Sequence, residues 1–291
     1  MDTLFQQFIN GLSLGAIYAL IALGYTMVYG VLRLINFAHG DVYMLGAFAG
    51  YFIANALNMD EHPSILGAMA VCAGIGILIE RLAYRPVRHH SRLTSLITAI
   101  GVSLLLEYGG QVVFGATPRF FPQMIRSQTY AVGGVQITNQ NLLIIVVSVV
   151  VMFGLQFIVH QTKIGKAMRA VSFDREAAAM MGIDPDRVIV YTFFIGSALA
   201  GAAGVLIGLV LFQAFPYMGF NYGLQAFTAA VVGGIGYIPG AMFGGLLIGF
   251  VQSFSQYYFT TWFQLVSLSL LVAVMLIRPS GLFGKATLEK V

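Results

Sequence analysis

Long apolar segments, separated by short polar loops, make up most of this chain. A helix needs about 20 mainly apolar residues, each adding about 1.5 Å of length, to cross the hydrocarbon layer of a membrane. Most of the apolar segments approach or reach this length, and they therefore predict transmembrane helices. They cover residues 8–30, 42–57, 64–80, 93–114, 141–160, 187–212, 223–235, 240–256 and 261–277.

The expected fold is an all-α, polytopic transmembrane bundle of eight or nine spans. The two counts differ over residues 223–235, which are too short to cross alone and are either a broken or re-entrant helix or a ninth span. The count decides on which side of the membrane the N-terminus lies. No repeat or low-complexity linker divides the chain, so residues 1–291 are expected to form a single transmembrane domain.

The composition excludes an ordinary soluble domain. Only 9% of the 291 residues are charged and 58% are hydrophobic, whereas a soluble domain has about 25% charged residues. Small residues recur four apart in several spans, which is typical of membrane helices that pack closely. Examples are the series Gly196, Ala200, Gly204 and Gly208 and the series Gly11, Gly15 and Ala19.

The basic residues indicate which loops face the cytoplasm. Of the fifteen Lys and Arg residues, all except Arg119 and Arg126 lie in loops or chain ends on one side of the predicted membrane. Because basic loops stay on the cytoplasmic side, those residues are expected inside and the loop of residues 115–140 outside. Within this outer loop, apolar residues flank Gly133 and Gly134 and predict a β-hairpin.

A charged stretch, residues 174–187, interrupts the apolar segments. Each of its Asp and Arg residues would cost about 2.5–3.5 kcal/mol at the centre of a bilayer, so the stretch must lie outside the membrane. Asp174 is a suitable N-cap for a short helix, and Gly182 suits a left-handed residue at its end. Asp184 and Pro185 then provide the cap and first residue of the next span.

The short helix, within a cytoplasmic loop of about residues 161–187, is expected to present an apolar surface to a partner. This surface comprises Ala177, Ala178, Met180 and Met181, with Arg175 and Glu176 at its rim, and Gly182 belongs to the same expected contact. Apolar side chains of this size can fill a groove on another protein, while charged side chains at the rim fix the orientation. The alternative is that this surface packs against the inner loops of the protein itself.

Polar residues also occur within or between the apolar segments. Asn36, His39 and Asp41 flank Gly40 at a junction between spans. They either line a translocation path or form a hydrogen-bonded helix junction, since irregular backbone at membrane depth must be buried in protein or line a cavity. Glu107 lies inside a predicted span and must face the bundle or water, in a packing or a transport role.

The inner loops contain no recognisable catalytic pattern. Glu80 and Arg81 end a span and are expected to form a local ion pair, whereas His89 and His90 are expected to be solvated loop residues. The phosphate-binding pattern Gly-x4-Gly-Lys-Ser/Thr is absent from the sequence, as are the spacings of a zinc site or a Ser–His–Asp triad. We therefore expect a chain that is not an enzyme and that binds no cofactor or metal ion.

Several motifs resemble those of a known transporter family. Glu176-Ala177-Ala178, followed after three residues by Gly182, resembles the E-A-A-x3-G signature of permease subunits in bacterial ABC importers. Tyr191-Thr192-Phe193-Phe194 stands where the wider signature has Ile-x-Leu-Pro, which favours the branched-chain amino acid branch. Three further passages resemble LivH-type permeases of that branch. They are residues 33–41, which include Asn36-Phe37-Ala38-His39-Gly40, residues 233–241 and residues 278–284.

This resemblance implies an importer in the inner membrane of a bacterium, built from two permease subunits, two cytoplasmic ATPases and an external substrate-binding protein. The short helix would dock on an ATPase. The chain would form half of the path for leucine, isoleucine or valine, or for a related solute such as another amino acid or urea. The second permease would be a second copy or a related chain, membrane lipid would surround both, and no nucleic acid partner is expected.

Three other functions remain as alternatives. An ion-coupled secondary transporter would need ionisable residues near the middle of the membrane, and Glu107 alone is a small supply. A passive channel could select its solute with backbone and small residues. A membrane scaffold would transport nothing. All three leave the Glu-Ala-Ala helix unexplained.

Overall fold

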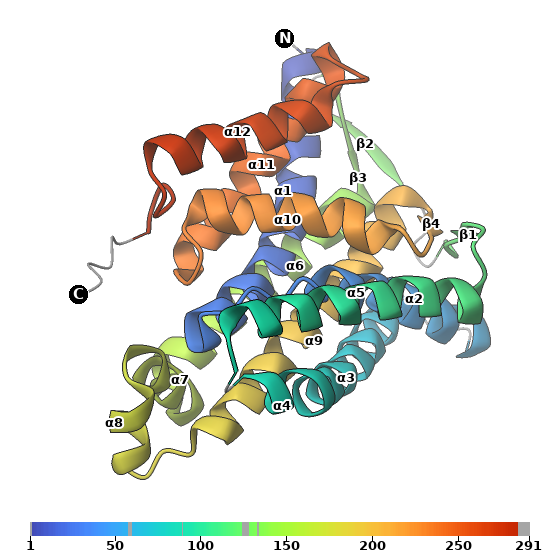
Figure 1. Ribbon diagram of the computed structural model, residues 1–291. Coiled ribbons are helices and arrows are strands. Elements are labelled where there is room, and N and C mark those ends of the chain that lie inside the picture. The colour runs from blue at the N-terminus through green and yellow to red at the C-terminus, as the bar shows by residue number, and fades with distance from the viewer. Residues whose placement is uncertain (1, 58–59, 89, 124–127, 133, 285–291) are drawn as a thin grey trace.

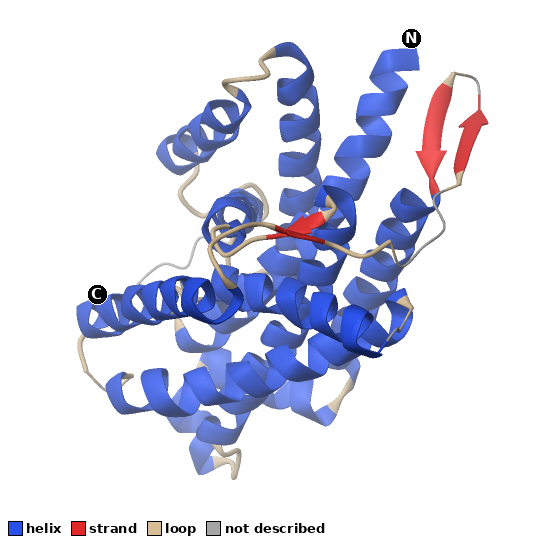
Figure 2. Ribbon diagram, turned by 90° about the vertical axis from the view of Figure 1, so that its right-hand side faces the viewer, coloured by secondary structure: helices blue, strands red, loops and turns tan. Residues whose placement is uncertain are grey.

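The computed structural model describes residues 2–57, 60–88, 90–123, 128–132 and 134–284. His89, Arg126, Gly133, Lys285 and Lys290, on which some of the sequence predictions rest, lie outside these residues. The described chain is a bundle of helices with two very short β-sheets (Figures 1 and 2). The predicted all-helical class is confirmed, and the small sheets are an addition to it.

Each of the nine predicted apolar segments coincides with a helix in the described part of the chain. These helices are α1 (Asp2–Leu32), α2 (His39–Leu57), α3 (Glu61–Ile79), α5 (Arg92–Phe114), α6 (Asn139–Gln161), α9 (Pro185–Leu211), α10 (Met218–Gly233), α11 (Ile238–Tyr258) and α12 (Phe263–Ile277). The apolar periodicity therefore located the helices, although several begin two to six residues earlier than predicted.

Six helices of the described residues are long and apolar enough to cross a membrane. They are α1, α5, α6, α9, α11 and the continuous helical segment Glu61–Val87 that starts with α3. By contrast, α12 has 15 residues and α10 has 16. A helix of 16 residues is about 24 Å long, which is less than the hydrocarbon thickness of about 30 Å. The expectation that the segment at 223–235 is too short to cross alone agrees with the length of α10.

Helix α1 lies at the centre of the bundle and packs against α6, α9, α10 and α11 (Figure 1). Its residues from Tyr18 to Leu23 are completely buried. Glycine makes this packing possible, because a Cβ added to Gly15 would lie 2.8 Å from the Cα of Leu246 on α11. The predicted series of small residues on α1 is thus a helix contact, in which the backbones approach closely.

The predicted hairpin is present. Strands β2 (Thr129–Val132) and β3 (Val135–Thr138) pair antiparallel, and Gly134 in the turn has a φ of +86°. The start of α1 is held beside it: Gln6 Nε2 donates to the carbonyl of Gln136 at 3.0 Å, and the Gln136 N–H donates to Gln6 Oε1 at 2.8 Å. Figure 2 shows the N-terminus next to this hairpin.

A second pair of strands was not predicted. Strand β1 (Arg119–Phe120) follows α5 and pairs antiparallel with β4 (Gln213–Ala214), which follows α9. The two strands join loops that are far apart in the sequence. Strands of only two residues are too short to produce an alternating pattern of apolar and polar residues that could be recognised in the sequence.

The segment after α3 is also more regular than predicted. The loop expected there is a π-helical turn, η1 (Glu80–Tyr84), followed by the short helix α4 (Arg85–Val87). Pro86 lies in α4, close to the end of the continuous helical segment Glu61–Val87. The basic residues Arg81 and Arg85 are therefore fixed on helical backbone and not in a flexible loop.

Candidate functional site

The loop of about residues 161–187, between α6 and α9, forms two helices at the end of the bundle opposite the N-terminus (Figure 1). They are α7 (Lys163–Phe173) and α8 (Arg175–Met180). Asp174 is the N-cap of α8, as predicted: its Oδ1 accepts hydrogen bonds from the N–H groups of Glu176 and Ala177, both at 2.9 Å. These bonds satisfy two of the donors that a helix start leaves free.

The end of α8 is fixed by Gly182. This residue has a φ of +84°, the left-handed conformation that the sequence predicted. Its N–H donates to the carbonyl of Ala179 at 3.0 Å, and the N–H of Ile183 donates to the carbonyl of Ala178 at 3.0 Å. This pair of bonds is a Schellman motif, which gives α8 a defined end although it has only six residues.

The next helix begins directly afterwards. Oδ1 of Asp184 accepts from the N–H groups of Asp186 at 3.0 Å and Arg187 at 3.3 Å, and Pro185 is the first residue of α9. Both caps and the position of Pro185 were predicted. The result is a rigid connection in which only residues 181–184 separate α8 from α9.

The exposed surface of this region differs from the predicted one. Met180 and Met181 are 82% and 83% exposed, but Ala178 is only 4% exposed and belongs to the hydrophobic core. A six-residue helix that packs against both α7 and α9 must bury one side, and Ala178 lies on that side. Phe173, at the end of α7, is 94% exposed and was not predicted. We call Phe173, Met180 and Met181 the exposed apolar surface.

Helix α7 was not predicted as a separate element. It buries Gly165, Met168 and Val171, which are three residues apart, and it exposes Lys163 and Lys166. This spacing is the signal by which the helix could have been recognised. It gives α8 a packed support instead of a flexible loop.

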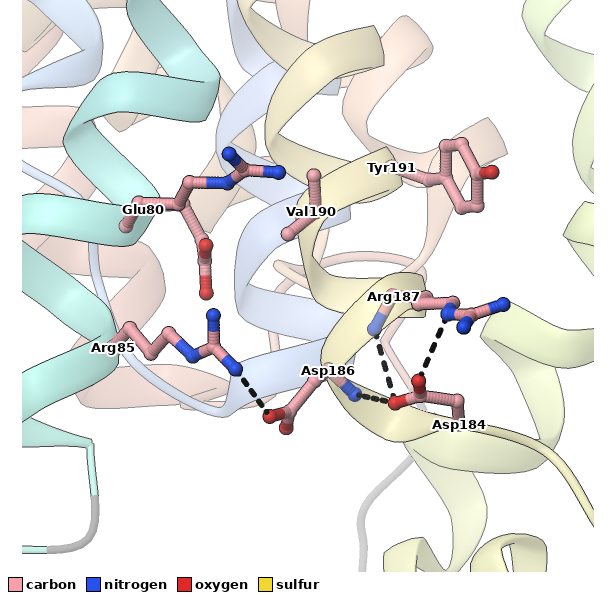
Figure 3. Close-up of a pocket in the computed structure, with 8 residues that line it drawn as sticks. Glu80, Arg85, Asp184, Asp186, Arg187, Val190 and Tyr191 are labelled. Carbon is pink, nitrogen blue, oxygen red and sulfur yellow. Dashed lines mark hydrogen bonds and ion pairs between the residues drawn. The ribbon is translucent and has the colours of Figure 1, made fainter.

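A cluster of charged residues connects the start of α9 to η1 and α4. Asp186 carries three arginine contacts: Oδ1 lies 2.5 Å from Arg88 Nη2 and 3.7 Å from Arg175 Nη2, and Oδ2 lies 3.5 Å from Arg85 Nη2. Figure 3 shows Arg85 pointing toward Asp186, whereas the Asp184–Arg187 pair is local to α9. Arg175, expected at the rim of a partner surface, thus also contacts its own chain.

The buried centre of this cluster is an ion pair between Glu80 and Arg88. Their Oε1 and Nη1 atoms are 3.3 Å apart, and the two side chains are 1% and 3% exposed. The prediction that Glu80 pairs with Arg81 was wrong, because η1 and α4 turn Arg88 toward Glu80. A buried ion pair that loses one partner leaves an uncompensated charge, which costs about 3–5 kcal/mol.

Part of this charged cluster lines an open cleft of about 440 Å³ (Figure 3). Among the residues that line it are Glu80, Arg85, Asp186 and Tyr191. Burial and the nearby Arg88 lower the pKa of Arg175, while Asp186 opposes this change. The lining of the cleft therefore holds both signs of charge.

The polar residues between α1 and α2 lie in the interior. Asn36, His39 and Asp41 are 3%, 1% and 1% exposed. The hydroxyl of Tyr84 donates to Oδ1 of Asn36 at 2.8 Å, and His39 packs edge-on to Tyr25 with ring centres 4.8 Å apart. The motif therefore connects the start of α2 to α1 and η1.

Asp41 and Glu107 belong to the same interior region. The hydroxyl of Ser103 on α5 donates to Oδ2 of Asp41 at 2.5 Å. Glu107 lies one turn further along α5 and is 9% exposed, so it faces the bundle although most of α5 is exposed. Neither carboxylate lines the charged cleft.

Comparisons with known proteins identify the family. The model of the family described as branched-chain amino acid transport system, permease component, matches residues 7–275. The chain is 42% identical to the high-affinity branched-chain amino acid transport system permease protein LivH of Escherichia coli, over 98% of this chain and 97% of the relative. It is 40% identical to the corresponding protein BraD of Pseudomonas aeruginosa, with the same coverage.

The chain belongs to this family. The resemblance inferred from the four motifs is thus confirmed over nearly the whole length. Members of the family are permease components, and the chain is accordingly a multi-pass membrane protein of a transport system and not an enzyme.

A solved structure supports the fold independently. The chain superimposes on PsaBC from Streptococcus pneumoniae in complex with Fab, with a TM-score of 0.50, at 15% sequence identity and over 96% of this chain and 93% of that one. At this identity the likeness concerns the fold alone.

Proposed function

We propose that this chain is the permease subunit of an ATP-driven importer of branched-chain amino acids and forms half of its translocation path. The full-length similarity to LivH and BraD, both named as parts of high-affinity branched-chain amino acid transport systems, is the observation that carries this proposal. The partners would be two cytoplasmic ATPases, a second permease and an external binding protein, with lipid around the bundle. Residues 1–291 would act as one domain.

The exposed apolar surface is where an ATPase would bind. Three large apolar side chains, Phe173, Met180 and Met181, project from short, well-capped helices. Exposed apolar side chains of this kind fit a groove on a partner protein. Glu176 and Ala177 would border this contact, Arg175 and Gly182 would fix the orientation of α8, and Ala178 would fix α8 to its own bundle.

Coupling requires that α8 transmit its position to the transmembrane helices. Two states of the ATPase can move the permease only if they contact α8 differently. Because residues 181–184 form a short capped link, α8 and α9 would move together, and Asp186 would carry this motion to η1 through Arg85 and Arg88.

The topology follows from the same assignment. Five apolar helices, α1, α2, α3, α5 and α6, precede α7. An odd number of crossings puts the N-terminus on the side opposite to α8. With α8 in the cytoplasm, the N-terminus and the β2–β3 hairpin are outside, in agreement with the positive-inside rule. We propose nine crossings, in which α10 covers only part of the thickness.

Transport by a reconstituted complex tests the proposal. The chain would be assembled in sealed vesicles with two ATPases, a second permease and a binding protein from the same organism. We expect uptake of labelled leucine, isoleucine or valine that requires ATP and the loaded binding protein. If only urea or another amino acid were taken up in the presence of ATP, that solute, and not a branched-chain amino acid, would be the substrate. Uptake driven by an ion gradient without ATP would refute the importer.

A further inference from the structure

A second cavity lies at the end of the bundle that carries the N-terminus and the hairpin. It has a volume of about 460 Å³ and is bounded by α1, α6, α9, α10, α11 and the start of α12. On α1 its lining runs from Gln7 to Leu14, which corresponds to about 10 Å of helix length. The cavity therefore extends from the proposed outer surface into the bundle.

The lining combines uncharged polar groups with an aliphatic wall. Amide and hydroxyl groups come from residues such as Asn10, Ser13 and Gln252, and Ile207 and Val210 provide aliphatic surface. None of the described residues that line the cavity is Asp, Glu, Lys or Arg. Amides and hydroxyls can donate to a carboxylate and accept from an ammonium group, so such a lining solvates both ends of a zwitterion.

Two polar groups at the inner end of the cavity have bonding capacity left. Ser13 is only 4% exposed and lines the cavity, yet its Oγ has no hydrogen-bond partner within the described chain. Gln252 is 6% exposed, and its Oε1 accepts from the hydroxyl of Tyr18 at 2.7 Å. This bond fixes the side chain and leaves its Nε2 group as the donor. A buried polar group without a partner is costly, and a polar ligand would supply the partner.

The cavity is closed toward the cytoplasmic end. Below Tyr18, α1 is completely buried as far as Leu23, and Gly15 contacts α11 so closely that a Cβ on Gly249 would overlap the backbone of Gly15. The structure thus has an outer cavity with a tightly packed floor.

We propose that this cavity is the outer binding site where the permease receives its substrate, a small zwitterion with an aliphatic side chain, with Ser13 and Gln252 as its polar contacts. The inference rests on the proposed import function and adds the site and its residues. The absence of a fixed charge from the described lining suits a site that must also release its solute, because a transport path requires binding that is weak enough to leave.

Thiol labelling tests this site, because Cys72, the only natural cysteine, is completely buried. Ser13→Cys replaces the hydroxyl with a thiol of nearly the same shape, and Asn10→Cys marks the exposed mouth. Ser148→Cys is the matched control, since Ser148 is also buried with an unpartnered hydroxyl but does not line the cavity. The intact complex in vesicles would be treated from outside with a small, membrane-impermeant methanethiosulfonate.

We expect labelling at positions 10 and 13 but not at position 148. Labelling at position 13 should stop ATP-dependent import of leucine. Excess leucine, added with the loaded binding protein, should slow the labelling reaction at position 13 at least fivefold. An unreactive cysteine at position 13, or a labelled one that leaves import unchanged, would overturn the inference while import by the unmodified complex still supports the proposed function. Loss of import by the unmodified complex would instead refute the proposed function.

Discussion

The carboxylate of Asp186 lies 2.5 Å from the guanidinium of Arg88, and this contact joins the first turn of α9 to the end of the α3–η1–α4 segment. Arg88 is in turn buried against Glu80. Asp186, Arg88 and Glu80 therefore form a continuous series of charge contacts from the start of α9 into the interior of the bundle. Because α8 is linked to α9 by a short capped turn, the position of α8 and the position of η1 depend on each other.

Asp186→Asn is expected to uncouple the permease. The substitution removes the negative charge that faces three arginines, while Glu80 still compensates Arg88. ATP-dependent uptake should fall by about tenfold, within the range typical of coupling between sites, with the protein still inserted. Asp184→Asn is the control, because Asn remains a good N-cap and only an exposed local pair is lost. Equal uptake by both variants would contradict the role of Asp186.

Arg88→Met is expected to lower the free energy of unfolding by about 3–5 kcal/mol, because Glu80 is left buried without its closest cation. Adding Glu80→Gln should restore much of this loss, since both buried charges are then absent. Thermal unfolding of the purified single and double variants would measure the coupling between the two residues. Additive losses would indicate that the two side chains do not act as a pair.

Gly40→Ala is expected to destabilise the junction between α2 and α10. A Cβ at this position would lie 2.6 Å from the carbonyl oxygen of Gly219 and 3.2 Å from the Cα of Gly223. Overpacking of this kind costs about 1–3 kcal/mol. At Gly74, where nothing lies within 4 Å of an added Cβ, alanine should be neutral or slightly stabilising. Thermal unfolding of the two variants, side by side, measures the difference.

Most of the fold could be predicted because it depends on local patterns. Apolar length located the helices, and Asp174, Gly182 and Asp184 marked the ends of α8 and α9 because capping acts within a few residues of the sequence. The hairpin was predictable for the same reason, since its turn contains Gly134 with positive φ.

The interior contacts could not be predicted from such patterns. Arg88 meets Asp186 across 98 residues of sequence, and Tyr18 meets Gln252 across 234, so no local spacing reports either pair. The burial of Ala178 was missed because a six-residue helix is too short for periodicity to define its buried side. The family motifs identified the protein's class, but the partners of each side chain depend on tertiary packing.

The buried side of α8 and the exposed residue at its C-cap should respond differently to an added charge. Met181→Asp alters a side chain that is 83% exposed, so the free energy of unfolding should change by less than about 0.5 kcal/mol. ATP-dependent uptake should nevertheless be lost, because a carboxylate would enter the apolar contact with the ATPase. Ala178→Asp buries an unpaired charge and should lower stability by about 3–5 kcal/mol. Uptake assays and thermal unfolding of both variants separate coupling from stability.

Cross-linking from position 181 would show whether the end of α8 lies against an ATPase. Met181→Cys would carry a thiol-reactive photo-cross-linker in the assembled complex, and Tyr130→Cys on the exposed hairpin would serve as the control. We expect a covalent product with the ATPase from position 181 and none from position 130. A reagent-accessible cysteine at position 181 that yields no product with the ATPase, or that is labelled only from outside the cell, would contradict this expectation.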